Sequence, residues 1–299
     1  MKLLKVLFII TLIMKAANVE ATDVTFSKET FTFGNTSIPY RKADIGGNGN
    51  KAALVIYLHG GTSKGNDNEA QLNEPGINSI TSWLVDHKRK AIMIVPQSPK
   101  DKSWLGIMLP VIKNLMQTFI ERGVADEQQV YIFGGSMGGT GTWNMLSSYP
   151  GFFAAAMPVA GNPSGLKAEA VKQTPLYTVM GTADVIMKIP IVETFLAEMD
   201  SYEAEYQFDI EEGWTHEDVC KQSYTDKRLT WVFSHTKGDI INSINDPCTI
   251  VHTNNLATTI EWYTLSGQRL PFKPLQRGVY IKNLLMNDGR EVSEKIYIP

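Results

Sequence analysis

The chain has 299 residues, of which 43% are hydrophobic and 20% are charged, and its formal net charge is −3. A chain of this size and composition can bury one sizeable core and still have residues left for an appendage, so we expect one main domain and a smaller addition. The slight negative charge provides no basic surface for nucleic acid or anionic lipid, which argues against a function in binding polyanions.

The first 21 residues have the features of an export signal. Lys2 and Lys5 precede the apolar run 7–14, and the segment ends in the small residue Ala21. The run is too short to span a bilayer, and no second long apolar segment follows it. We therefore expect a signal peptide over residues 1–21 and an exported protein (periplasmic, cell-surface or extracellular) without a membrane span. A buried N-terminal helix is the alternative.

Strand-like and helix-like segments then alternate along the chain. Residues 24–40 alternate as antiparallel edge strands do, and fully apolar runs typical of buried parallel strands follow at 53–58, 91–95, 130–133, 154–159 and 176–180. One helix is especially clear, because Ile112, Leu115, Met116, Phe119 and Ile120 share one helical face. This alternation predicts an α/β fold with a mostly parallel sheet and helices on both of its faces.

The composition changes near Gly238, after the amphipathic stretch 227–235. Beyond this point the helical period is lost, and short strands are expected at 258–265, 278–281 and 295–298. We therefore predict a main domain over residues 22–238 and a small β-rich module over residues 239–299.

The sharpest motif is Gly134-Gly135-Ser136-Met137-Gly138, which has the pattern G-x-S-x-G. A strand leads into it and a helix-forming run leads out, as in the tight turns that expose a serine hydroxyl at a sheet edge. Glycine is needed there because side chains would collide with the neighbouring backbone. Ser136 is therefore the candidate nucleophile, and the Met137 N–H at the helix start is a candidate oxyanion donor. A glycine-rich turn with an inert serine is the alternative.

A second oxyanion donor is expected from His59-Gly60-Gly61-Thr62, which directly follows the run 53–58. Glycines let the backbone approach a bound carbonyl, so the N–H of Gly61 or of Thr62 is the candidate donor. We expect His59 to be structural and assign it no catalytic role.

A serine nucleophile needs a base, and the base needs an acidic group that orients it. Both are expected after the serine, in the order Ser, Asp, His. Asp184 follows the run 176–180, and His216 follows the strand-like residues 204–210, so both are predicted at the carboxyl edge of the sheet, where ligands bind. The other candidates for the orienting acid are Asp200, Asp209 and Asp218.

Two tryptophans, Trp104 and Trp214, are candidates for the walls of a substrate site, although burial without ligand contact explains each of them equally well. No His or Cys cluster has metal-ligand spacing, so we expect neither a metal nor a cofactor. The two cysteines are Cys220 and Cys248. Export permits a disulfide between them, but two cysteines do not make a disulfide framework, and both a bridge and free thiols stay open.

Several of these segments together resemble a known family. They are Leu58-His59-Gly60-Gly61, Asn66-Asp67-Asn68-Glu69, Val95-Pro96-Gln97 with Trp104, Gly135-Ser136-Met137-Gly138-Gly139 and Gly141-Thr142-Trp143. They resemble secreted esterases grouped with feruloyl esterases, polyhydroxybutyrate depolymerases and related predicted peptidases. The resemblance implies an α/β-hydrolase fold, with the family's nucleophile at Ser136, its acid at Asp184 and its base at His216.

The C-terminal segment is similar to the sorting and adhesion modules of exported Bacteroidetes proteins. The similar stretches are Trp262-Tyr263-Thr264-Leu265-Ser266-Gly267-Gln268-Arg269, Gly278-Val279-Tyr280-Ile281 and Lys295-Ile296-Tyr297-Ile298. This resemblance implies secretion or cell-surface machinery as a partner, and a simple appended sandwich is the alternative.

The motifs predict a secreted serine carboxylesterase, and the resemblance favours feruloyl or acetyl esters on plant polysaccharide as substrates. A serine peptidase of the prolyl-oligopeptidase type uses the same triad and is the first alternative. The sequence shows no large N-terminal propeller that would gate peptides, which favours esters. A non-catalytic surface protein that binds glycans through Trp104 and Trp214 is the second alternative.

Overall fold

The computed structural model describes residues 24–237, 257–264, 266–270, 278–286 and 291–298. They fall into two compact units, one within Met1–Asn242 and one within Ser243–Pro299. The expected signal peptide, the boundary at Gly238 and the thiol of Cys248 lie outside the described residues, so they stay predictions. No described helix combines the length and the apolar character needed to cross a membrane.

The first unit is built on an eight-stranded sheet with the order β1-β2-β4-β3-β5-β6-β7-β8. The strands are β1 (Ser27–Phe33), β2 (Thr36–Ile45), β3 (Asn48–Leu58), β4 (Arg89–Pro96), β5 (Ala125–Gly135), β6 (Ala155–Val159), β7 (Leu176–Gly181) and β8 (Tyr206–Glu211). β1 and β2 are antiparallel to their neighbours, whereas β4, β3 and β5 to β8 are parallel. The predicted α/β class, the mostly parallel sheet and the antiparallel edge strands are confirmed.

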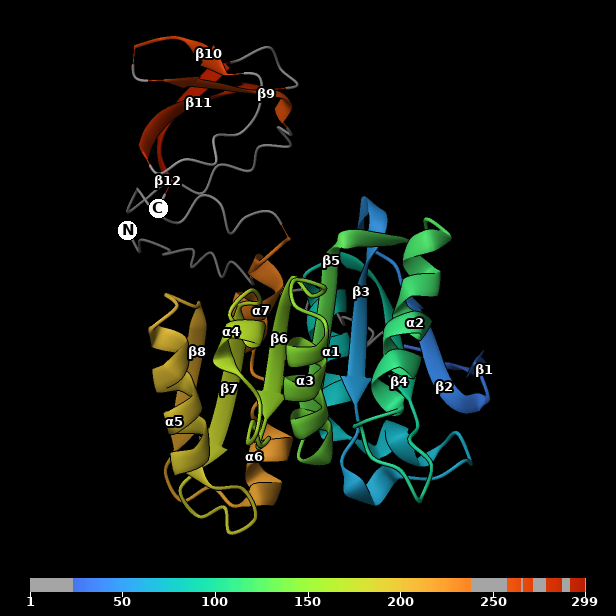
Figure 1. The fold of residues 1–299 in the computed structure, drawn as a ribbon. Helices are drawn as coiled ribbons and strands as arrows, with labels where there is room; N and C mark the ends of the chain where they lie inside the picture. The colour runs from blue at the N-terminus through green and yellow to red at the C-terminus, as the bar shows by residue number, and fades with distance from the viewer. Residues whose placement is uncertain (1–23, 238–256, 265, 271–277, 287–290, 299) are drawn as a thin grey trace, which may run out of the picture. The chain divides into compact units, whose positions relative to one another are not determined.

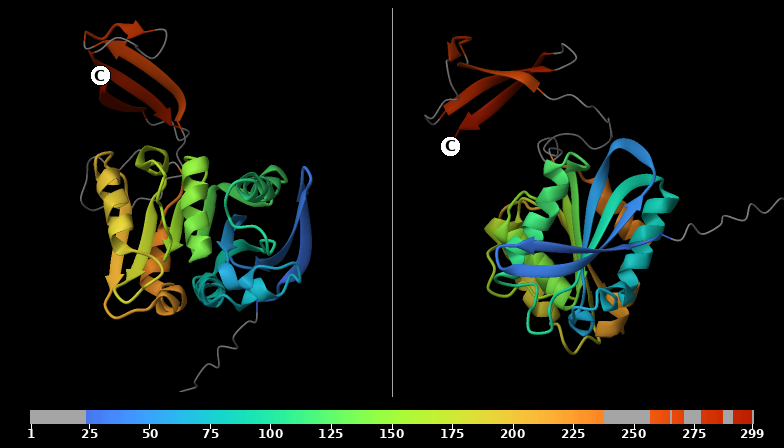
Figure 2. Two further views of the ribbon diagram at one scale, coloured as in Figure 1. Left: turned by 60° about the horizontal axis from the view of Figure 1, so that its bottom comes forward. Right: turned by 90° about the vertical axis from the view of Figure 1, so that its right-hand side faces the viewer.

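Helices cover both faces of this sheet, as Figures 1 and 2 show. The helices are α1 (Pro75–Asp86), α2 (Met108–Glu121), α3 (Met137–Ser148), α4 (Ala168–Val171), α5 (Ile189–Asp200), α6 (His216–Gln222) and α7 (Asp226–Ser234), with short 3-10 turns η1 (Gly61–Ser63) and η2 (Ala70–Asn73). α2, α3, α4 and α5 lie on one face, and α1, α6 and α7 lie on the other.

The core is split by the sheet into two apolar layers. Along β3, Leu54, Ile56 and Leu58 pack into one layer, while Val55 and Tyr57 pack into the other. Successive side chains of a strand point to opposite faces, so a sheet covered on both sides requires apolar residues at every position. This explains why the central strands were recognisable as unbroken apolar runs.

The second unit is a four-stranded antiparallel sheet with the order β10-β9-β11-β12. Its strands are β9 (Ala257–Thr264), β10 (Arg269–Leu270), β11 (Gly278–Met286) and β12 (Glu291–Ile298). The predicted β-rich character of the C-terminal segment is thus confirmed, whereas its role in sorting stays a prediction.

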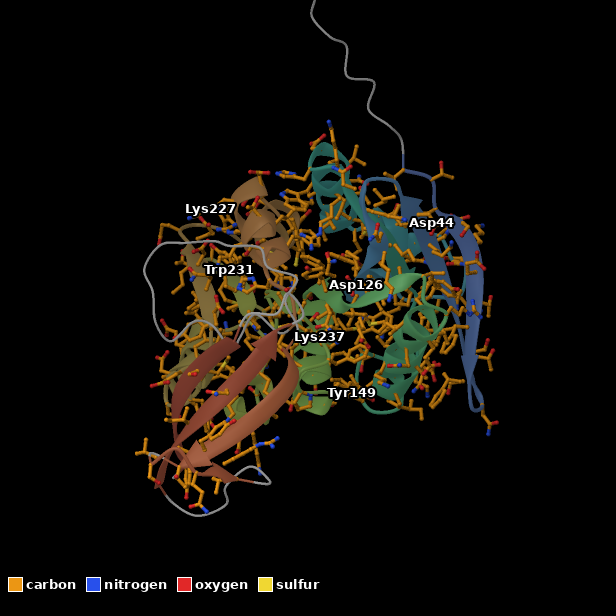
Figure 3. All side chains as sticks on the ribbon, turned by 90° about the horizontal axis from the view of Figure 1, so that it is seen from above. Asp44, Asp126, Tyr149, Lys227, Trp231 and Lys237 are labelled. Carbon is orange, nitrogen blue, oxygen red and sulfur yellow. The ribbon has the colours of Figure 1, made fainter. Side chains whose placement is uncertain are left out.

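The direction of the parallel strands fixes where the site lies. Their carboxyl ends meet at the lower edge of the sheet in Figure 1, where β5 passes into α3 and where α6 begins. Figure 3 views the opposite end of this unit, where Asp126, Trp231 and Lys237 lie.

Candidate active site

Ser136 lies on a strained turn between β5 and α3. Its backbone has φ 58° and ψ −117°, a left-handed conformation that costs energy for a residue with a side chain. The turn is compact because glycines surround the serine. A Cβ on Gly134 would lie 2.4 Å from the Gly138 carbonyl oxygen, and one on Gly138 would lie 1.8 Å from the Leu58 carbonyl oxygen. The glycines of the motif are therefore required by close backbone contacts.

The structure brings the three predicted side chains into one hydrogen-bonded chain. His216 Nε2 lies 2.8 Å from Ser136 Oγ, and His216 Nδ1 lies 2.8 Å from Asp184 Oδ2. The three residues follow the ends of β5, β7 and β8. Along the chain, His216 lies 32 positions from Asp184 and 80 positions from Ser136. With Nδ1–H donated to the carboxylate, Nε2 is free to accept the serine proton.

The Asp184 carboxylate is fixed by its second oxygen. Oδ1 accepts hydrogen bonds from the N–H groups of Ile186 and Met187, at 2.8 and 2.9 Å. Its side chain is fully buried, while the His216 side chain is 17% exposed. A carboxylate held in this way can orient an imidazole and stabilise its charged form without itself moving.

His216 is the first residue of α6, and a capping box sets its position. Thr215 Oγ1 accepts the Asp218 N–H, and the Asp218 carboxylate accepts the Thr215 N–H in return. The other acids that the sequence left open are engaged elsewhere. Asp218 caps α6, Asp209 accepts from Arg228 and Tyr177, and Asp200 accepts from the Tyr206 hydroxyl.

The loop after β3 lies directly beside the nucleophile turn. Besides the Leu58 contact, the Cβ position of Gly60 is 3.7 Å from the Gly135 carbonyl oxygen. Among the described residues, no hydrogen bond occupies the backbone N–H of Gly61, Thr62 or Met137. Such free N–H groups are suited to bind an oxyanion, and the role of these three residues stays a prediction.

His59 is buried and structural, as expected. Its Nε2 accepts the Ser98 N–H at 2.9 Å, so Nδ1 carries the proton and donates to the Gly60 carbonyl at 2.6 Å. Burial lowers the pKa of His59 to about 4 and outweighs the hydrogen bond to Gly60, which raises the pKa. The imidazole therefore stays neutral and ties the loop to the segment after β4.

The neutral state of His59 predicts a loss of stability in acid. An unfolded histidine binds a proton below about pH 6.5, whereas folded His59 binds one only near a pKa of about 4. The free energy of unfolding should therefore fall between these two values by up to about 3 kcal/mol. Urea unfolding at pH 7, 6, 5 and 4 checks this, with His59→Gln expected to show a shallower loss.

The matched control for this experiment is His87→Gln. His87 stacks on Trp83 at the surface, and its replacement leaves both hydrogen bonds of His59 intact. The free energy of unfolding of His87→Gln should depend on pH as steeply as that of the wild type. Identical slopes for wild type and His59→Gln would contradict the prediction.

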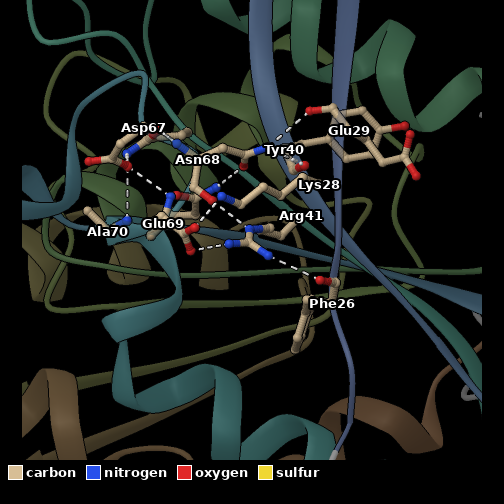
Figure 4. Close-up of polar contacts among 11 residues, drawn as sticks. Phe26, Lys28, Glu29, Tyr40, Arg41, Asp67, Asn68, Glu69 and Ala70 are labelled. Carbon is tan, nitrogen blue, oxygen red and sulfur yellow. Dashed lines mark hydrogen bonds and ion pairs between the residues drawn. The ribbon is translucent and has the colours of Figure 1, made fainter.

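Two groups that sequence reasoning missed support the same loop. Glu74, just before α1, accepts hydrogen bonds from the Gly60 N–H and from the Ser63 hydroxyl. Arg41 on β2 donates to the Asn68 carbonyl and pairs with the Glu69 carboxylate, as Figure 4 shows. A buried charged residue does not follow the hydrophobic periodicity of a strand or helix, so the sequence contained little sign of either group. Glu74 directly precedes a helix that begins with proline, but an exposed glutamate is equally common at such a position.

Trp104 is not a wall of an open site, contrary to the prediction. Its side chain is 1% exposed, and its indole N–H donates to the His59 carbonyl at 2.9 Å. A Cβ on Gly141 would lie 2.3 Å from the Trp104 Cβ, so the indole is wedged between the His59 loop and α3. Almost no surface is left for a ligand, and Trp104 instead braces the loop from within the core.

Trp214 is partly exposed and lies in the loop just before His216. Its carbonyl accepts the Ala183 N–H at 3.1 Å, which joins the loop of the base to the turn of the acid. Its ring lies 6.0 Å from the Arg228 guanidinium, and the side chain lines an open surface pocket with Asp209 and Glu211. Ser136 does not line that pocket, so contact of Trp214 with a substrate stays a prediction.

Cys220 on α6 is a free thiol beneath the nucleophile turn. The position of a Cβ on Gly135 is 3.4 Å from its Sγ, and burial raises the pKa of Cys220 to about 12. A thiol with this pKa is un-ionised and unreactive at neutral pH. Among the described residues, no group of three or more His, Cys, Asp or Glu side chains could hold a metal ion.

The prolyl oligopeptidase family model matches residues 112–164, which contain Ser136 but neither Asp184 nor His216. A search of curated proteins finds no match.

Solved structures share the fold over most of the first unit. A thermostable esterase is 24% identical with a TM-score of 0.63, and the match covers 71% of this chain and 63% of the esterase, less than two thirds of its length. The feruloyl esterase module from Clostridium thermocellum, a mutant complexed with sinapinate, is 15% identical with a TM-score of 0.56, covering 76% of this chain and 91% of the module. The acylaminoacyl peptidase of Pyrococcus horikoshii is 12% identical with a TM-score of 0.54, covering 77% of this chain and 44% of the peptidase.

The fold is that of the α/β-hydrolases, and the carboxyl edge of its sheet carries hydrogen-bonded Ser, His and Asp side chains, an arrangement that serine hydrolases use.

Proposed function

We propose that the protein is a serine carboxylesterase in which Ser136 is the nucleophile, His216 the general base and acid, and Asp184 the residue that orients His216. The observation that carries the proposal is the unbroken chain of contacts from Asp184 through His216 to Ser136, each of 2.8 Å. This chain ends beside backbone N–H groups that have no partner among the described residues.

The geometry supports acyl transfer to water in two steps. Ser136 Oγ attacks the ester carbonyl while its proton passes to His216 Nε2, and the Met137 N–H with the N–H of Gly61 or Thr62 stabilises the oxyanion. His216 then protonates the leaving alcohol, which leaves an acyl group on Ser136. A water molecule, deprotonated by His216, attacks this acyl-enzyme, and the carboxylic acid is released as Ser136 recovers its proton.

For the substrate, we favour feruloyl or acetyl esters linked to plant polysaccharide. Support comes from the sequence resemblance and from the likeness in fold to the Clostridium thermocellum feruloyl esterase module. Val185 and Ile186, which directly follow Asp184, are 80% and 61% exposed. Exposed apolar side chains at a catalytic edge suit an apolar acyl group better than a charged one.

The test is hydrolysis of an aryl acetate by the wild type and by Ser136→Ala. Removing the nucleophile should lower kcat by about ten-thousandfold or more, while the folded structure is kept. Ser201→Ala, which changes a serine whose hydroxyl donates to the Glu198 carbonyl, is the matched control and should keep wild-type activity. Equal rates for wild type and Ser136→Ala would remove the proposal, and failure of a fluorophosphonate probe to label Ser136 would favour the non-catalytic glycan-binding alternative. Feruloylated and acetylated oligosaccharides then identify the acyl group.

A serine peptidase is the second candidate, because the matched family model is that of prolyl oligopeptidases. The triad serves both reactions, so the discriminating measurement compares a p-nitrophenyl ester with the matched anilide. Faster cleavage of the ester by the same Ser136-dependent activity supports the esterase.

Export forms part of the same proposal. It is supported by the pattern of residues 1–21 and by the resemblance of the C-terminal segment to sorting and adhesion modules. Sequencing the N-terminus of the protein recovered from the producing cells would establish whether cleavage follows Ala21.

A further inference from the structure

Glu74 is a buried carboxyl group that does not belong to the triad. It directly precedes α1, yet its hydrogen bonds are not those of a helix-capping residue. It is the N-cap residue of α1, yet its side chain makes no capping hydrogen bond to that helix. Carboxylates at helix starts ordinarily accept the free N–H groups of the first turn. Burial raises the pKa of Glu74, so placing the charged group here is costly for the fold.

The carboxylate instead holds the loop after β3 at two points. Glu74 Oε1 accepts the Gly60 N–H at 3.0 Å and the Ser63 hydroxyl at 2.6 Å. These contacts lie immediately before and immediately after Gly61 and Thr62. One oxygen atom thus anchors both ends of the short turn whose N–H groups have no partner among the described residues.

The residues just before this turn pack against the residues on both sides of Ser136. The Cβ position of Gly60 lies 3.7 Å from the Gly135 carbonyl oxygen, and that of Gly138 lies 3.0 Å from the His59 carbonyl oxygen. Oxyanion donors act only when they stand about 3 Å from the developing charge, so a small displacement of the turn removes much of their effect.

We propose that Glu74 is the positioning residue of the oxyanion hole, holding the Gly61–Thr62 backbone N–H groups toward the carbonyl that Ser136 attacks. The inference rests on the proposed function, since it requires Ser136 to act as a nucleophile. Glu74 does not touch the substrate and acts through Gly60 and Ser63. An oxyanion forms only in the transition state, so loss of Glu74 should affect kcat and leave substrate binding largely unchanged.

Three variants test the proposal with p-nitrophenyl acetate. Glu74→Ala removes the acceptor and should lower kcat by about 10- to 100-fold, with KM changed by less than about threefold. Glu74→Gln keeps a carbonyl oxygen for both donors and should recover kcat to within about threefold of wild type. Ser63→Ala removes one of the two contacts and should lower kcat by about three- to tenfold. The rate at which a fluorophosphonate labels Ser136 should fall in the same order.

Glu205→Ala is the matched control. Glu205 is also a carboxylate with one strong partner, His235 Nε2 at 3.0 Å, but its side chain is half-exposed and it lies just before β8, at the opposite end of the strands. It should keep wild-type kcat, and urea midpoints measured for all variants separate lost activity from lost folding.

The proposal is overturned if folded Glu74→Ala keeps wild-type kcat, if its loss lies in KM alone, or if Glu74→Gln is as impaired as Glu74→Ala. Should Glu74→Ala not fold, wild-type kcat and labelling rate in Ser63→Ala would overturn it in the same way. In each of these cases the wild type still hydrolyses the ester, so the proposed function stands. A wild type inert toward both ester and probe would instead overturn both.

Discussion

Asp184→Asn is expected to lower kcat about ten-thousandfold while leaving the fold intact. In the native protein Asp184 Oδ1 accepts the N–H groups of Ile186 and Met187, and Oδ2 accepts from His216 Nδ1. An asparagine must keep its carbonyl oxygen toward the two N–H groups, because the opposite orientation would set donors against donors. Its amide nitrogen then faces His216 Nδ1 and forces the proton onto Nε2. His216 in that tautomer has no lone pair available for the proton of Ser136.

The measurement is kcat on an aryl ester with circular dichroism as the check on folding. Asp200→Asn is the control, because Asp200 is an acid that the sequence also offered and its side chain accepts from the Tyr206 hydroxyl at the surface. It should behave as wild type. A folded Asp184→Asn variant within about tenfold of wild-type kcat would show that Asp184 does not set the tautomer.

Gly138→Ala is expected to destabilise the protein by more than about 4 kcal/mol, enough to prevent folding in many domains. The added Cβ would stand 1.8 Å from the Leu58 carbonyl oxygen. The colliding atom belongs to the backbone of β3, so no side-chain rotation relieves the clash and α3 has to move away from the sheet. Activity should be lost with stability, because the same movement separates Ser136 from the loop after β3.

Urea unfolding compares this variant with Gly46→Ala. Gly46 lies between β2 and β3, and a Cβ there would meet nothing within 4 Å. That substitution should change the free energy of unfolding by less than about 1 kcal/mol. A Gly138→Ala protein of native stability would mean that α3 and β3 are packed less closely than the structure has them.

The central strands could be predicted from the sequence because helices cover both faces of the sheet. Burial on both sides requires unbroken apolar runs, and those of β4 and β7 were found within two residues of their ends. β5 begins at Ala125, five residues before its apolar run, because Ala125 already pairs with Ala52 of β3, and the polar residues 126–129 lie where the register of this pairing shifts. Patterns of hydrophobicity report burial, whereas strand pairing also includes exposed residues.

The candidate catalytic side chains could be selected from sequence because each follows a strand, and chain order reduced the number of candidates. Ser136, Asp184 and His216 follow β5, β7 and β8, and parallel strands deliver such residues to one edge. Glu74 and Arg41 could not be selected, because their function depends on contacts to loop backbone that no periodicity encodes. Trp104 was misjudged for a related reason, since its position after a strand says nothing about the direction of its side chain.

The order of the strands also bears on when the contacts between Ser136, His216 and Asp184 can form. β8 forms one border of the eight-stranded sheet and joins it only through β7. Until this outermost strand has docked, the imidazole that follows it is missing, and the serine remains an ordinary alcohol. In the proposed esterase, hydrolysis during refolding should therefore begin only after β8 has joined β7.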